Sequence, residues 1–158
     1  MIVAASTGCF PEQDLSTVID LLIDLEFSAV EIHINEERGH LKPSDIIRDF
    51  EGAVIACRQS RRLTPIGFYF DSEATGDRYI EEFTAVCKLA KAIKIVTVTI
   101  RASELGTPFN EEVERLRVLV DIAMKEGVVV GVATEKGRMM EDTNTIDILC
   151  RQIRGLSI

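Results

Sequence analysis

The chain has 158 residues, of which 46% are hydrophobic and 28% are charged, and its formal net charge is −8 at pH 7. This length suits one domain with a sizeable core, and the acidic balance argues against nucleic-acid binding, which depends on Lys and Arg neutralising phosphates. The N-terminus lacks the basic region of a signal peptide, and no apolar stretch approaches the roughly 18 residues of a membrane span. We therefore expect a cytoplasmic protein without a nucleic-acid or membrane partner.

Predicted strands and helices alternate along the chain, with a strand first in each unit. Short runs of β-branched and aliphatic residues predict strands at residues 2–6, 29–34, 63–70, 94–100 and 128–134. Between these runs, apolar residues recur at helical spacing in stripes that begin at Leu15, Ile46, Ile80, Val113 and Ile146. Five strand–helix units in succession require parallel strands joined by right-handed crossovers, so the chain is an α/β protein.

Capping residues mark the predicted ends of two helices. Asn110 is a predicted N-cap, because acidic residues follow it in the first turn. Gly127 is a predicted C′ glycine, and Gly155 is expected to end the last helix in the same way.

The four cysteines are widely separated and form no C-x-x-C pair, so they encode no zinc site. Cys9 lies in a loop without an adjacent base that would activate it as a nucleophile. The other three fall on the apolar sides of predicted helices, where we expect reduced core residues: Cys57, Cys87 and Cys150.

Side-chain alternation separates two faces of every predicted strand. In the second strand, one face carries Val30, Ile32 and Ile34, whereas the other carries Glu31 and His33. The later strands show the same alternation. Their polar or small face carries Tyr69, Asp71, Thr97, Thr99, Arg101, Gly131 and Glu135. Their apolar face includes Ile66, Phe68, Phe70, Val96, Val98 and Ile100. An open doubly wound sheet needs both faces apolar, so the pattern favours a TIM barrel, with a five-stranded flavodoxin-like sheet as the alternative.

The chain is shorter than a whole barrel of this kind. Eight βα units need about 250 residues, whereas this chain has 158. Its last residues, "GLSI", follow the fifth predicted helix and are typical of the start of a sixth strand. We therefore expect one partial TIM-barrel domain over residues 1–158, truncated after five of eight units. Exposed sheet edges would then favour self-association.

Three segments carry a resemblance to a known family: "STVIDLLIDLEFSAVEIHI", "CKLAKAIKIVTVTI" and "GTPFNEEVERLRVLVDIAMKEGVVVGVATEKGRMMED". In this order and spacing they resemble the N-terminal portion of the sugar phosphate isomerase/epimerase family, the xylose-isomerase-like TIM barrels. The resemblance implies a metal-dependent isomerase or epimerase that acts on a sugar or sugar phosphate by removing a proton next to a carbonyl group. It also implies that this fragment alone is inactive.

The resemblance gives Glu135 a role, because a Glu at the end of strand five is commonly a ligand of the catalytic divalent metal in that family. Mn²⁺ or Mg²⁺ is expected rather than Zn²⁺, and the remaining ligands would come from strands beyond Ile158. Glu135 would act as ligand, as catalytic base, or as both. The alternative is a surface carboxylate paired with Lys136. The three-zinc nuclease branch of the family is poorly supported, because the chain has only two histidines.

Other candidates lie near the same strand ends. His33 and Arg101 share the facing of Glu135, Tyr69 ends the third strand, and Phe10 lies in the first strand-to-helix loop. The alternative for Arg101 is a structural ion pair with Glu31 across the barrel. Position on a barrel of this kind predicts four substrate-binding residues: Phe10, His33, Tyr69 and Arg101.

A function without catalysis is the competing hypothesis. A complete flavodoxin-like or receiver-like module would also have about this length, but a receiver needs an Asp cluster at early strand ends. Thr7, Asn35 and Asp71 do not supply that cluster. A barrel-derived interaction or assembly unit is a third reading.

Overall fold

The computed structural model describes residues 3–158, so residue 2 of the first predicted strand lies outside the described part of the chain. Six parallel strands form one sheet in which each strand pairs with the next along the chain. The strands are β1 (Ala4–Ser6), β2 (Ala29–Ile34), β3 (Thr64–Phe70), β4 (Thr97–Arg101), β5 (Val129–Ala133) and β6 (Leu156–Ser157).

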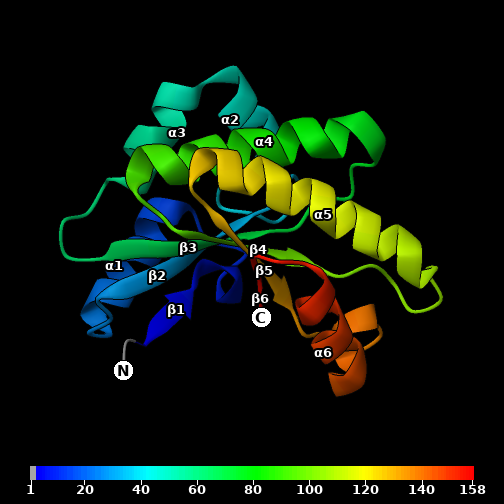
Figure 1. Cartoon of the computed structure of the whole chain (residues 1–158). Helices are drawn as coiled ribbons and strands as arrows, with labels where there is room; N and C mark the ends of the chain where they lie inside the picture. The colour runs from blue at the N-terminus through cyan, green and yellow to red at the C-terminus, as the bar shows by residue number, and fades with distance from the viewer. Residues whose placement is uncertain (1–2) are drawn as a thin grey trace.

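The helices follow the strands in alternation: α1 (Leu15–Asp24), α2 (Pro43–Arg48), α3 (Phe50–Cys57), α4 (Gly76–Ile93), α5 (Phe109–Glu126) and α6 (Thr143–Gln152). Two short 3₁₀ turns, η1 (Thr7–Cys9) and η2 (Met139–Glu141), follow β1 and β5. Figure 1 shows α2, α3, α4 and α5 on one side of the sheet. Among the described residues, no helix is both long and apolar enough to cross a membrane.

The strand order settles the choice of fold class. A flavodoxin-like sheet has the order 2-1-3-4-5, because its connections reverse direction and place helices on both faces. Here the order is sequential from β1 to β6, so right-handed crossovers carry every helix to the same face of the sheet. The prediction of parallel βα units of a TIM barrel is confirmed, and the flavodoxin-like alternative is wrong.

The core lies between the helices and the predicted apolar face of the strands. Val30, Ile32 and Ile34 of β2 are fully buried, as are Phe68 and Phe70 of β3. They pack against the stripes of α1, α4 and α5 in one continuous cluster. Burial of each such side chain contributes about 1.5–3 kcal/mol to folding, so the face that the alternation assigned to the core is also the face that stabilises the sheet.

Two residues assigned to that face lie elsewhere. The register between β2 and β3 shifts, because Val30 pairs with Pro65 and Glu31 pairs with Gly67. Ile66 is the extra residue of this bulge and is 40% exposed. Val96 precedes β4 and is 59% exposed. Alternation is interrupted by the bulge at Ile66, whereas Val96 is exposed because it lies before the first residue of β4.

The second predicted helix is two helices. Asp49 ends α2 and caps α3, because its carboxylate accepts a hydrogen bond from the Gly52 amide at 3.0 Å. A side chain that satisfies the first amides of a new helix competes with continuation of the old one. The apolar stripe continues across the break, which is why periodicity alone merged the two helices.

The predicted helix ends are partly right. Gly127 ends α5 in the left-handed region with φ of 73°, as predicted. Asn110 is not an N-cap, because α5 already begins at Phe109 after Pro108. Gly155 also has a positive φ, of 93°, but α6 ends earlier, at Gln152.

All four cysteines are free. Cys57 and Cys87 are buried, and burial raises the pKa of each thiol to about 12. Cys150 is half-buried and Cys9 is exposed. The prediction of reduced core residues is confirmed for Cys57 and Cys87, and Cys150 lies at the core margin.

Candidate functional site

The carboxyl ends of β2 to β5 bring five polar side chains together. Residues of neighbouring strands lie in register, since His33 is opposite Tyr69 and Arg101 is opposite Ala133. Asp71 follows β3, and Glu135 follows β5. We refer to His33, Tyr69, Asp71, Arg101 and Glu135 as the strand-end cluster.

Glu135 is the shared acceptor of this cluster. Its Oε1 accepts a hydrogen bond from the Tyr69 hydroxyl, and its Oε2 accepts one from Arg101 Nε at 3.1 Å. Burial would raise the pKa of Glu135, but the bonds from Tyr69 and Arg101 outweigh it and hold the pKa below its ordinary value. The carboxylate is therefore ionised at neutral pH, and its ion-pair partner is Arg101 rather than the adjacent Lys136.

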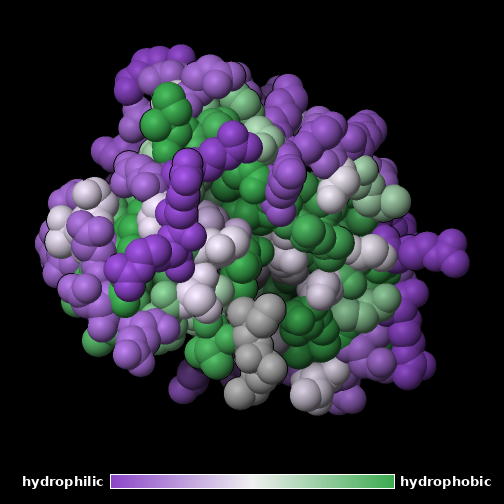
Figure 2. Space-filling model, turned by 90° about the vertical axis from the view of Figure 1, so that its left-hand side faces the viewer, coloured by the Kyte–Doolittle hydropathy of each residue, from purple (hydrophilic) through white to green (hydrophobic). Residues whose placement is uncertain are grey.

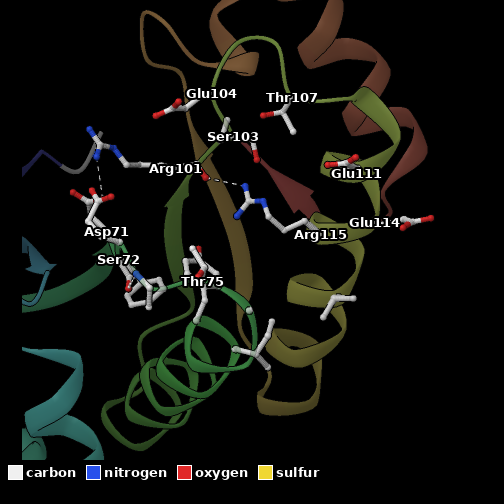
Figure 3. A pocket seen from close by; sticks show the side chains of 18 of the residues that line it. Asp71, Ser72, Thr75, Arg101, Ser103, Glu104, Thr107, Glu111, Glu114 and Arg115 are labelled. Carbon is white, nitrogen blue, oxygen red and sulfur yellow. Dashed lines mark hydrogen bonds and ion pairs between the residues drawn. The ribbon is translucent and has the colours of Figure 1, made fainter.

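Arg101 joins the two carboxylates of the cluster. Besides its bond to Glu135, its Nη1 donates to Asp71 Oδ1 at 3.1 Å, and Figure 3 shows the side chain directed toward Asp71. The alternative pairing with Glu31 is therefore wrong. Burial disfavours the charged guanidinium, yet Asp71 and Glu135 raise its pKa above the ordinary value. The cluster thus has one cation between two carboxylates.

Tyr69 contributes a neutral donor. Burial is the main cause that raises the pKa of its hydroxyl, and the bond to Glu135 raises it further. A phenol that stays protonated can donate only if an acceptor faces it, and Glu135 is that acceptor. The Tyr69 ring lies against the His33 ring with a centroid distance of 5.5 Å.

His33 is placed by its backbone rather than by its ring. Its amide donates to Thr7 Oγ1 at 2.9 Å, whereas both ring nitrogens are buried and have no partner among the described residues. Nε2 lies 4.0 Å from Asp71 Oδ2. Burial lowers the pKa of His33, so the ring is neutral at pH 7. Buried polar atoms without partners are uncommon in folded proteins.

The structure therefore brings together four of the five predicted site residues: His33, Tyr69, Arg101 and Glu135. Phe10 is not among the residues that these contacts join. It is half-buried and packs against the core, and its carbonyl lies 3.2 Å from His40 Nε2. Asp71, which the alternation assigns to the polar face, joins the cluster although it is not among the five predicted site residues.

A metal ion would find oxygen donors here but not a full set of ligands. Each Glu135 oxygen accepts one hydrogen bond, which leaves further lone pairs for a hard cation. Within residues 3–158, however, no group of three or more His, Cys, Asp or Glu side chains is placed to hold a metal. The described residues by themselves do not form a complete metal site.

A pocket of about 840 Å³ adjoins the cluster, between the loop that precedes α4 and the loop that precedes α5. Its walls include Asp71, Arg101 and Arg115, and its rim carries the acidic residues Glu104, Glu111 and Glu114. Figure 3 shows Arg115 directed across the pocket toward the backbone of Arg101.

Sequence reasoning missed two buried carboxylates that hold these loops. Glu112 Oε2 accepts a bond from Ser103 Oγ at 2.6 Å, and Glu82 Oε2 accepts one from Ser72 Oγ at 2.5 Å. A signal was present, since each Glu immediately precedes an apolar residue of a buried helical stripe, Val113 or Phe83.

No protein-family model and no curated protein matches the sequence. Solved structures do match. One is described as the probable 3-DHS dehydratase AsbF, involved in petrobactin synthesis, from Bacillus anthracis; it is 14% identical with a TM-score of 0.76, and the match covers 99% of this chain and 61% of that one. A second is the IOLI protein with a bound zinc atom, at 13% identity, a TM-score of 0.69 and the same coverage.

A third match is a D-tagatose 3-epimerase-like protein, which is 15% identical with a TM-score of 0.65. This match covers the whole of the present chain and 64% of the other. The chain thus spans less than two thirds of the length of each of these three structures. Identities of this size establish the fold alone: the chain folds as part of a TIM barrel and matches 61–64% of the length of each of these structures.

Proposed function

We propose that the chain is the N-terminal part of a metal-dependent isomerase or epimerase that acts on a sugar or sugar phosphate. The observation that carries the proposal is the hydrogen-bonded group of Tyr69, Arg101 and Glu135, which come from three neighbouring strands. They meet at the carboxyl ends of the strands, where TIM barrels have their active sites.

The reaction class follows from the state of these groups. Glu135 is an ionised carboxylate and accepts the proton next to a substrate carbonyl group, or binds the metal, or does both. Arg101 carries five N–H donors, of which two contact the described carboxylates, so donors remain for substrate oxygens. We assign His33 and Tyr69 to substrate binding beside Arg101, and Phe10, which directly follows η1 and packs against the core, stays a fourth candidate.

The metal belongs to the proposal as well. Oxygen ligands suit Mn²⁺ or Mg²⁺, and one protein of similar fold was solved with zinc. We assign Glu135 as one ligand and place the others outside residues 3–158. We propose further that this chain alone is inactive, that the protein is cytoplasmic, and that the open sheet edges favour self-association.

A dehydratase is the second candidate, because the structure with a TM-score of 0.76 is described as a probable dehydratase. Loss of water from a β-hydroxy carbonyl compound begins with the same proton removal. The product distinguishes the two reactions, since an isomerase or epimerase retains the hydroxyl group and a dehydratase forms a double bond.

The test measures exchange of carbon-bound hydrogen. The product of the whole gene is incubated with Mn²⁺ and a panel of ketoses and β-hydroxy ketones in D₂O, and deuterium incorporation is followed by NMR. We expect incorporation next to the carbonyl group and a loss of at least about 100-fold in Glu135→Gln, the usual contribution of a catalytic acid or base.

Glu51→Gln is the matched control, because Glu51 is an exposed carboxylate on α3 outside the cluster. It should exchange deuterium at the wild-type rate. Full activity of Glu135→Gln would reject Glu135 as base and as ligand.

A further inference from the structure

Buried polar side chains are confined to one end of the sheet. Among the described residues, the buried polar or charged side chains are Thr7, Asn35, Glu82 and Glu112. Thr7 follows β1 and Asn35 follows β2, while Glu82 and Glu112 bond to the loops after β3 and β4. Each therefore supports one of four successive strand-to-helix loops.

Glu112 holds the loop after β4 through two residues, Ser103 and Arg115. Its carboxylate accepts bonds from the Ser103 amide at 3.1 Å and from the Ser103 hydroxyl at 2.6 Å. Arg115 binds the same carboxylate through Nε at 2.7 Å and Nη2 at 2.9 Å. Arg115 Nη2 also donates to the Arg101 carbonyl at 3.0 Å, a contact drawn in Figure 3. The backbone of Arg101 is thus tied to a fully buried carboxylate.

Glu82 repeats the device one unit earlier. Its carboxylate accepts bonds from Ser72 Oγ at 2.5 Å and from Arg78 Nε at 3.0 Å. Ser72 follows Asp71, and the Asp71 carbonyl accepts a bond from Asn35 Nδ2 at 2.8 Å. In both units a buried Glu is paired with an Arg one turn away and binds a loop Ser, which lies one or two residues after a strand-end residue of the cluster.

Stability alone does not account for these carboxylates. A buried ion pair repays its desolvation only with excellent geometry, and apolar residues of similar size often stabilise a protein as well or better. Burial disfavours the Glu112 carboxylate, but Arg115 and Ser103 outweigh that effect and lower its pKa. The network fixes backbone positions with directional bonds, which apolar packing cannot do.

We propose that Glu112 and Glu82 are positioning residues that hold Arg101 and Asp71 in the geometry that Glu135 requires. The inference rests on the proposed function in one respect: the residues that are held in position belong to the proposed site. Its physical content, that the buried network sets where the Arg101 side chain lies, is independent of the reaction.

The test separates positioning from stability. In the double variant Glu112→Leu/Arg115→Met the buried ion pair is replaced by apolar side chains, so the fold is kept while the tie to the Arg101 carbonyl is lost. The readout is the side-chain Nε–H signal of Arg101 in ¹H–¹⁵N NMR spectra of the 158-residue chain, assigned with Arg101→Lys. We expect this proton to exchange with water about tenfold faster, as when a hydrogen bond between charged groups weakens.

Lys91→Met/Glu126→Gln is the matched control, since it removes an ion pair between α4 and α5 at their other ends. It should leave the Arg101 signal unchanged. If Glu112→Leu/Arg115→Met does not fold, Ser103→Ala decides, with an expected acceleration of about threefold for the loss of one hydrogen bond.

An Arg101 signal at the wild-type position and exchange rate in a folded variant would overturn the proposal. Because this readout needs neither substrate nor metal, it stands or falls separately from the deuterium-exchange test of the proposed function.

Discussion

The two ends of the sheet are built differently. At the carboxyl ends, ionisable side chains converge and buried polar residues hold the loops. At the amino ends, the turns into β4 and β5 pass through left-handed residues, Lys94 and Gly127. Large apolar side chains are exposed at or near this end: Val3, Leu25, Ile66, Val96 and Val129. Figure 2 shows apolar surface gathered around a hollow on the side where β1 and β3 begin.

The contrast supports the carboxyl ends of the strands as the place of the proposed site. Buried polar groups cost free energy unless every bond is satisfied, so their gathering at one end of the sheet, among residues 3–158, holds that end to a defined geometry. The amino ends need only turn the chain, and backbone conformation suffices. On TIM barrels the same division separates the catalytic face from the stabilising face.

The largest expected effect on stability is at the carboxyl end, and it is measured by breaking one ion pair at each end of the sheet and comparing the losses. Glu112→Ala leaves Arg115 half-buried without its carboxylate, and we expect the free energy of unfolding to fall by about 3 kcal/mol. Glu126→Ala removes the carboxylate partner of the exposed Lys91 and should cost less than about 1 kcal/mol. Urea unfolding of both variants measures the difference. Equal losses would contradict the contrast between the ends.

A smaller effect is expected at Gly127. Its φ of 73° favours glycine, and an added Cβ would meet no atom within 4 Å, so Gly127→Ala tests the backbone conformation alone. We expect a cost of about 1 kcal/mol in urea unfolding. A neutral result would show that the amino-end turn is not limited by this residue.

The pH dependence of stability sharpens the comparison further. Because the folded state lowers the pKa of Glu112, its contribution is complete above the ordinary glutamate range and is lost as the pH falls through the lowered pKa. The wild-type chain should therefore lose more stability between pH 5 and about pH 3 than Glu112→Leu/Arg115→Met does. Parallel curves of unfolding free energy against pH for the two proteins would argue against an ionised Glu112 in the fold.

The smallest effect on folding is expected at the exposed apolar residues. Val96→Lys should change the free energy of unfolding by less than about 0.5 kcal/mol, because Val96 is exposed and precedes β4. We expect it to reduce self-association of the chain, measured by sedimentation velocity. A wild-type chain that sediments as a monomer at every concentration would remove the basis for this expectation.

Much of the fold was predictable because strand parity and helical periodicity are local signals. The buried positions Ile32, Phe68 and Val98 follow directly from alternation. The bulge at Ile66 and the break at Asp49 were not predictable, since one depends on the register of a neighbouring strand and the other on a cap inside a continuous apolar stripe.

The site was predictable in position but not in its bonds. Side-chain alternation along the strands predicts Tyr69, Arg101 and Glu135 on the polar face at the carboxyl ends of the strands, and the structure has them there. Which acid pairs with Arg101 depends on side-chain reach across strands, so Glu31 was as good a candidate as Glu135. Glu112 escaped notice because carboxylates are seldom fully buried, so its position beside Val113 was not weighed.

The carboxyl titration of Glu135 tests the central claim most directly, that Tyr69, Arg101 and Glu135 form one hydrogen-bonded group. The measurement is the carboxyl ¹³C chemical shift of Glu135 as a function of pH. Because Tyr69 and Arg101 outweigh burial, the pKa of Glu135 should lie below the ordinary glutamate value. It should rise in Arg101→Met and in Tyr69→Phe. An ordinary pKa of Glu135 in the wild-type chain, unchanged in both variants, would contradict the account.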